Sequence, residues 1–203
     1  MNNSLIISLL FLIVGCSRLI DEPSLIEKNG VMYLPQSDKP YSGDVSKSDN
    51  FGKTLLKGTY KNGKKDGLWT EWDENGQKKS EGKFEDDKKD DLWKDYYENG
   101  QLQEEGHYKE GKYEGLWRRY FDNGILSIKG NYKDDKQDGF WKSYYDNGQL
   151  YLDRIYKDGK LEGLWKSYYD NGQLKYEWNY KEGELISQKC WDEDGSVKEC
   201  LND

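Results

Sequence analysis

The sequence predicts an all-β protein, an elongated antiparallel array of β-hairpins with a 24-residue period, on three observations. A Gly-Leu-Trp motif or a close variant recurs every 24 residues, with tryptophans at Trp69, Trp93, Trp117, Trp141 and Trp165. An Asn-Gly pair follows each tryptophan at one fixed offset, starting with Asn75-Gly76. Aromatic residues make up 15% of a chain that is only 34% hydrophobic. A fixed period of this length indicates stacked units that are each too small to bury a core alone.

The composition determines what kind of core such an array can have. Charged residues are 34% of the chain and its mean hydropathy is -1.13, values that alone would fit disorder. The 8 Trp, 17 Tyr and 5 Phe argue against disorder, because their rings can supply the buried surface. The net charge is -8, and basic and acidic residues are interleaved in every repeat. Since no basic stripe forms, we expect no nucleic-acid partner.

The pattern divides the chain into five segments. Residues 1–15 are a predicted lipoprotein signal peptide, and residues 16–29 are a polar tether. Residues 30–42 hold an N-terminal cap strand that is ended by a proline. Residues 43–186 are six 24-residue repeats, and residues 187–203 are a degenerate C-terminal capping repeat. Terminal repeats are expected to be atypical because they close the stack.

The N-terminal prediction rests on an apolar run at Leu5–Val14. The run is too short to span a bilayer as a helix, but it has the length of the apolar part of a secretory signal. The following Gly15-Cys16-Ser17 resembles a bacterial lipobox, which implies cleavage before Cys16 and a lipid on its thiol. That resemblance implies a lipid-anchored protein of the bacterial cell envelope, and Ser17 resembles an outer-membrane sorting residue of Gram-negative lipoproteins. Met1–Ser4 lacks the usual basic residue, so the alternative is a buried segment with an incidental cysteine.

Each repeat is predicted to be one hairpin. In the last full copy, two alternating aromatic-rich runs, 164–170 and 173–180, flank Asn171-Gly172. Asn-Gly between such runs predicts a two-residue type I′ turn with positive φ at both residues. The connections between units look longer and polar, as at residues 61–66. Successive hairpins should therefore pair as an antiparallel meander.

A two-residue loop also fixes which residues face each other. Counting outward from Asn75-Gly76 and its equivalents places a tryptophan opposite a glycine in three units, at Trp69–Gly82, Trp93–Gly106 and Trp117–Gly130. A ring there can lie over bare backbone, so we interpret these residues as structural. Trp141 and Trp165 instead face Arg154 and Trp178, where we expect cation–π and aromatic contacts.

Alternation along the strands gives the sheet two faces. One face carries Trp165 and several tyrosines and is the expected buried side. The other is mixed but repeats an aromatic residue, and we call this set the aromatic stripe: Trp72, Tyr96, Tyr120, Tyr144 and Tyr168. The stripe is either ordinary cross-strand packing or a surface that stacks on a ligand such as a sugar ring.

The remaining cysteines, Cys190 and Cys200, flank a hairpin-turn signal at Asp194-Gly195. Thiols facing each other across such a hairpin approach closely enough for a disulfide, which an oxidising compartment would preserve. We predict this disulfide, with two free thiols as the alternative.

The sequence offers no arrangement of catalytic residues. A single histidine, His107, removes most catalytic triads and metal sites. Paired carboxylates such as Asp86-Asp87 lie in polar loops, where solvated turns are the ordinary interpretation. No Gly-rich phosphate loop precedes a helix. We therefore expect a protein that is not an enzyme and has no metal and no cofactor.

The unit at residues 163–184, GLWKSYYDNGQLKYEWNYKEGE, resembles the variant MORN repeat of bacterial proteins, and Pro40-Tyr41-Ser42-Gly43 is similar to the way such arrays begin. The resemblance implies a meander of hairpins that serves as a scaffold or protein-binding module. With Cys16, it suggests a lipid-anchored envelope scaffold. The alternatives are a cell-wall glycan binder that uses the aromatic stripe, and an antitoxin-like protein, because many similar proteins are described as members of toxin–antitoxin systems. The sequence does not fix the oligomeric state.

Overall fold

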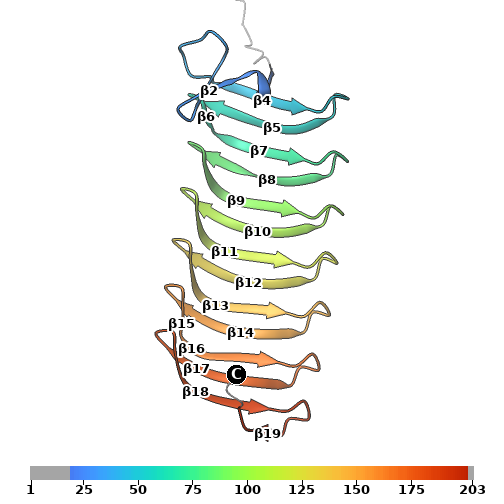
Figure 1. Ribbon diagram of the computed structural model, residues 1–203, viewed down its shortest axis with the longest axis vertical. Coiled ribbons are helices and arrows are strands. Elements are labelled where there is room, and N and C mark those ends of the chain that lie inside the picture. Colours follow the sequence, from blue (N-terminus) through green and yellow to red (C-terminus); the bar gives the residue numbers. More distant parts are fainter. Residues whose placement is uncertain (1–18, 201–203) are drawn as a thin grey trace, which may run out of the picture.

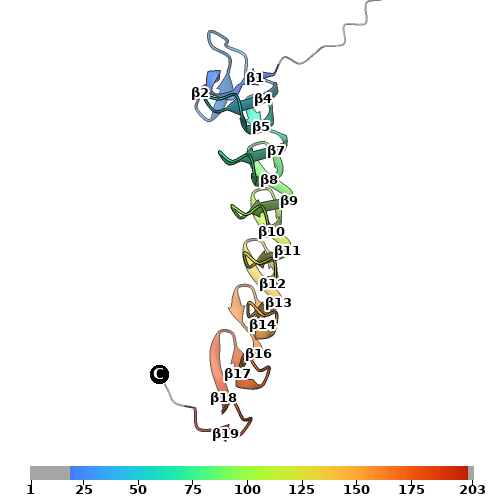
Figure 2. The same cartoon turned by 90° about the vertical axis from the view of Figure 1, so that its right-hand side faces the viewer.

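The computed structural model describes residues 19–200. Within this range, one 17-stranded sheet contains every strand except β2 and β3. The hairpins stack one after another along the long axis (Figure 1). The view turned by 90° shows that the stack is a single sheet thick (Figure 2). The predicted all-β array of antiparallel hairpins is confirmed.

The strands of the stack follow one another in chain order, and strands that lie side by side pair antiparallel. They are β4 (Gly43–Ser48), β5 (Thr54–Lys61), β6 (Lys64–Lys65), β7 (Gly67–Trp72), β8 (Lys78–Glu85), β9 (Lys88–Tyr96), β10 (Leu102–Lys109), β11 (Lys112–Tyr120), β12 (Leu126–Lys133), β13 (Lys136–Tyr144), β14 (Leu150–Lys157), β15 (Lys160–Leu161), β16 (Gly163–Tyr168), β17 (Leu174–Lys181), β18 (Glu184–Trp191) and β19 (Val197–Lys198). The last strand pairs with only two residues of β18.

A small cap covers the N-terminal end of the sheet. It consists of β1 (Ile20–Asp21), a 3-10 turn (Glu22–Ser24), β2 (Ile26–Lys28) and β3 (Val31–Tyr33). β1 pairs in parallel with β4, while β2 and β3 form their own hairpin. Leu25 of the cap and Val45 of the sheet belong to one buried cluster. The predicted tether over residues 16–29 is therefore wrong for residues 20–28, because isolated apolar residues such as Ile20 and Leu25 give this polar segment a side to bury.

The two edges of the stack carry different turns, and the prediction placed the type I′ turn at the wrong edge. At the Asn-Gly edge the loop has three residues, since the Asp73 N–H donates to the Gln77 carbonyl (2.9 Å) and only Gly76 has a positive φ (84°). That pattern is a type I turn followed by a bulge. At the other edge, two-residue turns such as Asp86-Asp87 have φ of 49° and 68°, as type I′ requires. The predicted longer connection between units is also wrong.

The predicted register is observed nevertheless, because a bulge beside each three-residue loop offsets its extra residue. Glu71 pairs with Ser80, whereas Trp72 pairs with Lys78, so β8 contains one residue more than its partner at this point. The pairs that the sequence predicts all form, namely Trp69–Gly82, Trp93–Gly106, Trp117–Gly130, Trp141–Arg154 and Trp165–Trp178.

Side chains at the Asn-Gly edge link one repeat to the next. The Asn99 Oδ1 accepts the N–H of Gln101 (3.0 Å), while its Nδ2 donates to the Asp122 carbonyl in the following turn (2.9 Å). The Tyr97 hydroxyl donates to the Tyr120 carbonyl (2.7 Å). Equivalent side-chain links between turns start at Asn123, Tyr145, Tyr169 and Asn171. These links explain why asparagine and tyrosine recur at positions that a turn alone would leave free.

Candidate functional site

The tryptophan-bearing face is built from rings that lie on glycine backbone. Trp93 pairs in register with Gly106, yet its ring lies over Gly82, where an added Cβ would overlap the indole. The other ring–glycine contacts of this kind are Trp69–Gly58, Trp117–Gly106 and Trp141–Gly130. The predicted contact between each ring and the glycine directly opposite is therefore wrong, because the ring lies on a glycine of the preceding hairpin. The ring that covers a glycine comes from the next repeat.

A bulge in each tryptophan-bearing strand accompanies this offset. Tyr108 pairs with Tyr113 and Gly106 with Trp117, so β11 contains two more residues than β10 between these pairs. Gly115 within this bulge has a φ of 87°, a left-handed conformation that favours glycine. Extra residues bend and twist a strand locally, which re-aims the tryptophan toward the preceding hairpin.

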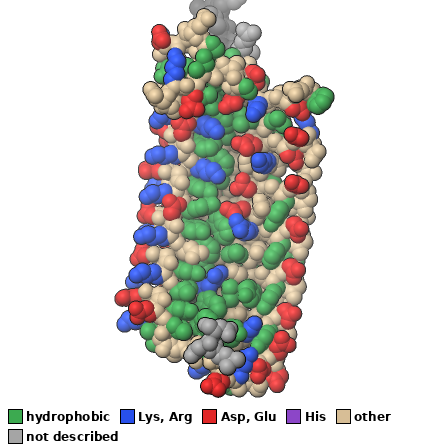
Figure 3. Space-filling view, in the orientation of Figure 1, with side chains coloured by type: hydrophobic (Ala, Val, Ile, Leu, Met, Phe, Trp, Pro, Cys, Tyr) green, Lys and Arg blue, Asp and Glu red, His purple; other side chains and the backbone are tan. Residues whose placement is uncertain are grey.

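These rings are buried although the sheet has only one layer. Trp69, Trp93, Trp117 and Trp141 are 2–7% exposed. Edge-to-face contacts with neighbouring rings cover them, such as the 4.8 Å contact between Phe84 and Trp93. The Lys89 ammonium lies 4.2 Å from the centre of the Trp93 ring. Figure 3 shows a continuous column of hydrophobic side chains that runs along the stack between charged margins.

The column changes where arginine replaces glycine. Trp165 would lie over residue 154, but Arg154 occupies that position, and Trp165 stacks on Trp178 instead (ring centres 4.5 Å apart). The expected aromatic contact thus forms. The expected cation–π contact with Trp141 does not, since the Arg154 guanidinium lies over Tyr156 at 5.9 Å. Within residues 19–200, Arg154 Nε and Trp178 Nε1 are buried without a hydrogen-bond partner.

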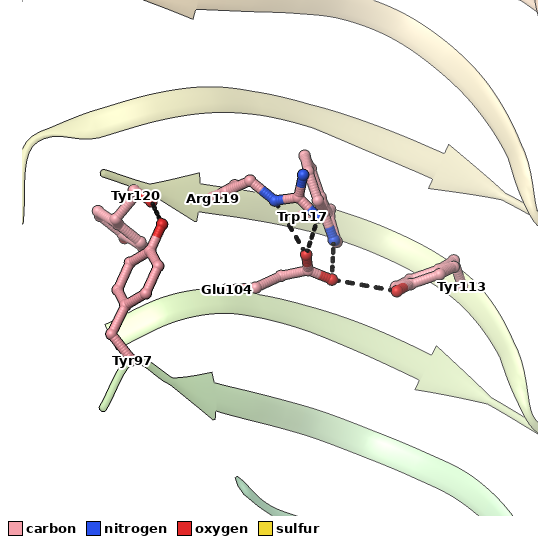
Figure 4. Close-up of polar contacts among 6 residues, drawn as sticks. All are labelled: Tyr97, Glu104, Tyr113, Trp117, Arg119 and Tyr120. Atoms are coloured by element: carbon pink, nitrogen blue, oxygen red, sulfur yellow. Dashed lines mark hydrogen bonds and ion pairs between the residues drawn. The ribbon is translucent and has the colours of Figure 1, made fainter. Parts of the chain in front are cut away.

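A carboxylate cluster lies at the centre of this face (Figure 4). Glu104 Oε1 accepts hydrogen bonds from Trp117 Nε1 (2.9 Å) and the Tyr113 hydroxyl (3.2 Å). Its Oε2 accepts from Arg119 Nη2 (2.8 Å) and Nε (3.2 Å). Four donors saturate the carboxylate, so the cluster is structural. The sequence analysis missed it, because it derived the pairing only within each hairpin, whereas Glu104 and Arg119 pair between two successive hairpins.

Asp95 is the neighbouring acid on the same face. It pairs across strands with Ser80 on one side and Glu104 on the other. Burial raises the pKa of Asp95, and the charges of Glu104 and Glu71 add to this rise against the opposing charge of Lys89. The single histidine, His107, is exposed with its Nδ1 3.3 Å from the Leu116 carbonyl. Among the described residues, no group of three or more His, Cys, Asp or Glu side chains is placed to hold a metal.

The aromatic stripe lies on the opposite face, near the Asn-Gly edge, and all five of its members are half-buried. Its four tyrosines each pair with a leucine across the strands, as Tyr120 does with Leu126. The Tyr96 hydroxyl donates to Glu81 (2.6 Å), and the Tyr120 hydroxyl donates to Glu105 (3.1 Å). Burial and these carboxylates raise the pKa of both tyrosines, so the hydroxyls stay protonated donors.

The structure brings two stripe residues together in a hollow. Trp72 and Tyr96 line a space of about 550 Å³ between two successive turns, together with Lys78, Asn75 and Glu74. Lys78 contributes because it takes the cross-strand place that leucine has in later repeats. Tyr120, Tyr144 and Tyr168 do not line this hollow.

The cysteines divide between described and undescribed parts of the chain. Cys190 and Cys200 form a disulfide with a Cα–Cα distance of 5.4 Å. Cys16 and the predicted signal peptide lie outside the described residues. Among the residues from 19 to 200, no helix has the length and apolar character needed to cross a membrane.

A model described as the MORN repeat variant matches residues 65–86, 92–110, 113–134, 137–158 and 161–182, more than half of the chain. The chain belongs to the MORN repeat variant family. Its first and last hairpins lie outside the MORN matches, at the two ends of the stack. No curated protein matches the chain.

Proposed function

We propose that this MORN repeat protein is a non-enzymatic scaffold that binds a protein partner through the face bearing the aromatic stripe. The hollow at Trp72 and Tyr96 is the observation that carries the proposal. Its tyrosine is held by Glu81, which also accepts a hydrogen bond from Lys78 (2.6 Å). Half-buried aromatic side chains that are already fixed lose little conformational entropy on binding, which favours them as anchors for a partner.

We further propose that Cys16 carries a lipid that holds the chain in the bacterial envelope. The lipobox resemblance of Gly15-Cys16-Ser17 supports this. β1 begins at Ile20, so a lipid on Cys16 would hold the cap end of the stack near the membrane. The test is metabolic labelling with a lipid precursor. A Cys16→Ser variant that still takes up label would contradict the proposal.

A glycan ligand is the second candidate, and the composition of the same hollow favours it. Trp72 and Tyr96 offer ring faces, while Asp73, Glu74 and Asn75 offer hydrogen-bonding groups beside them. Sugar rings bind through this combination of an apolar ring face and polar neighbours. The antitoxin-like alternative has only the family resemblance in its favour.

One experiment separates the two candidates. Wild-type chain, a Trp72→Ala/Tyr96→Ala variant and a Tyr168→Ala control would each be exposed to purified peptidoglycan and, separately, cross-linked to envelope proteins. The control removes a stripe ring outside the hollow, and circular dichroism would establish folding. A specific protein cross-link that only the hollow variant loses supports the scaffold. Retention on peptidoglycan with that same dependence supports the glycan binder and contradicts the scaffold.

A further inference from the structure

A row of charged side chains crosses the sheet on the face opposite the tryptophans. Each member is the direct cross-strand partner of the next, from β8 to β18: Glu81, Lys94, Glu105, Arg118, Lys129, Lys142, Asp153, Lys166, Glu177 and Lys189. We call this set the charge row. Acidic and basic residues alternate along it, which is the stabilising arrangement for direct cross-strand neighbours.

The alternation fails at one place. Arg118, Lys129 and Lys142 are three successive cations, on β11, β12 and β13. Like charges directly opposite each other are destabilising, so the fold bears a local cost here. All three side chains belong to half-buried residues, which weakens the screening of their repulsion by solvent.

The outer two cations are neutralised, and the central one is not. Arg118 Nη1 lies 2.7 Å from Glu105, and the Lys142 ammonium lies 3.2 Å from Asp153. Among the described residues, no carboxylate lies within 4.0 Å of the Lys129 ammonium, whose contact is the Tyr144 ring at 5.9 Å. The middle of the break therefore has a surplus positive charge.

The same three cations line a hollow of about 340 Å³ that also has apolar walls. Leu116, the cross-strand partner of Asn131, lines this hollow together with Phe140, which is 65% exposed. A large exposed aromatic ring beside an unneutralised ammonium is an arrangement that a ligand with both an acidic and an apolar group would complement.

We propose that this hollow binds an acidic peptide segment of a partner protein. A carboxylate of the segment lies against Lys129, between Arg118 and Lys142, and a neighbouring apolar side chain packs on Phe140 and Leu116. The inserted carboxylate restores the alternation of the charge row. This inference rests on the proposed protein-binding function and adds a second contact surface, in the middle of the stack.

The dimensions favour a single acidic segment over an extended polyanion. Three adjacent strands span about 10 Å at a spacing of about 4.8 Å. Glu105 and Asp153 bound the cationic stretch on its two sides and would repel a longer polyanion or an anionic bilayer surface. The chain's net charge of -8 acts in the same sense at longer range.

The test uses the peptide acetyl-Glu-Leu-Glu-Leu-amide and its control acetyl-Gln-Leu-Gln-Leu-amide, titrated into the isotope-labelled chain. We expect amide shifts confined to the strand segments around Arg118, Lys129 and Phe140. The control peptide should bind at least about tenfold more weakly, because it cannot form the charge-assisted hydrogen bond. A Lys129→Glu variant should bind neither peptide. Because it restores the alternation, that variant should also unfold at a higher urea concentration than the wild type.

The inference would be overturned by equal binding of the two peptides, by unchanged peptide binding of Lys129→Glu, or by a lower urea midpoint for that variant. Binding to vesicles that contain phosphatidylglycerol without binding to the acidic peptide would also overturn it. The proposed function is tested separately by the cross-linking of the Trp72→Ala/Tyr96→Ala variant. If the Trp72→Ala/Tyr96→Ala variant loses a protein partner that the Lys129→Glu variant still binds, only the present inference is refuted.

Discussion

Replacing Gly130 by alanine tests whether the ring of Trp141 needs bare backbone beneath it. Gly130 does not have a positive φ, so the backbone there accepts alanine. Alanine in a strand should even be favoured, because glycine is less stable there by about 0.5–1 kcal/mol. The obstacle is the indole, since a Cβ on Gly130 would overlap three of its ring atoms.

The size of the effect follows from how deeply the ring is buried. Trp141 is 2% exposed. A buried aromatic side chain removes about 150–250 Å² from water, so expelling the ring completely would cost about 4–6 kcal/mol at about 25 cal/mol per Å². A partial shift is the usual response to overpacking, and we expect a loss of about 1–3 kcal/mol in the free energy of unfolding. Gly106→Ala should cost less, because the nearest ring atom of Trp117 is 2.8 Å from the added Cβ.

The assay is urea unfolding, followed by far-ultraviolet circular dichroism, for Gly130→Ala, Trp141→Ala and the double variant. With the ring removed, Gly130→Ala should be neutral or slightly stabilising, which gives a coupling energy of about 1–3 kcal/mol. If Gly130→Ala costs the same in both backgrounds, to within about 0.5 kcal/mol, the ring and the glycine are independent and the reasoning fails.

Four other changes have defined outcomes. Tyr145→Phe removes the hydrogen bond that the hydroxyl donates to the Tyr168 carbonyl, and it should lower the free energy of unfolding by about 0.5–1.5 kcal/mol. Phe121→Tyr, at the equivalent position, should raise the free energy of unfolding. Unchanged urea midpoints would contradict both expectations. Reducing the Cys190–Cys200 disulfide opens a loop with a sequence separation of 10 and should cost about 2–3 kcal/mol, measured by urea unfolding with and without reductant; equal midpoints would argue against a stabilising role. Burial raises the pKa of Asp95, so the native state binds this proton more tightly than the unfolded chain, and the destabilisation by the carboxylate disappears as the pH falls toward about 4. Asp95→Asn should therefore raise the urea midpoint at pH 7 more than at pH 4, and an equal gain at both would be evidence against this titration.

Much of the fold could be predicted because period and alternation are local properties of the sequence. The 24-residue interval and the Trp69–Gly82 register follow from counting. The turn types did not follow, because Asp86-Asp87 adopts the left-handed pair of conformations without glycine, while Asn75-Gly76 joins a three-residue loop. In those turns the tertiary pairing of the strands outweighed local preference.

The side-chain contacts were harder to predict than the pairing. Counting gives the residue opposite Trp93, but only the bulge beside Asp91 (φ 62°) sends its ring over Gly82 instead of Gly106. The hollow at Trp72 was hidden for a similar reason, since it depends on Lys78 at a position where the later repeats have leucine. The repeated spacing of the aromatic stripe indicated that its members share a face. The hollow depends instead on a residue that differs between repeats.

The central claim is that four tryptophan rings, those of Trp69, Trp93, Trp117 and Trp141, each lie on a glycine of the preceding hairpin, so that these repeats depend on their neighbours. Nuclear Overhauser contacts from the Trp93 ring protons test it most directly. We expect contacts to the Hα protons of Gly82, which the ring current should also shift upfield. Contacts to the Hα protons of Gly106, the cross-strand partner, in place of those to Gly82 would contradict the account.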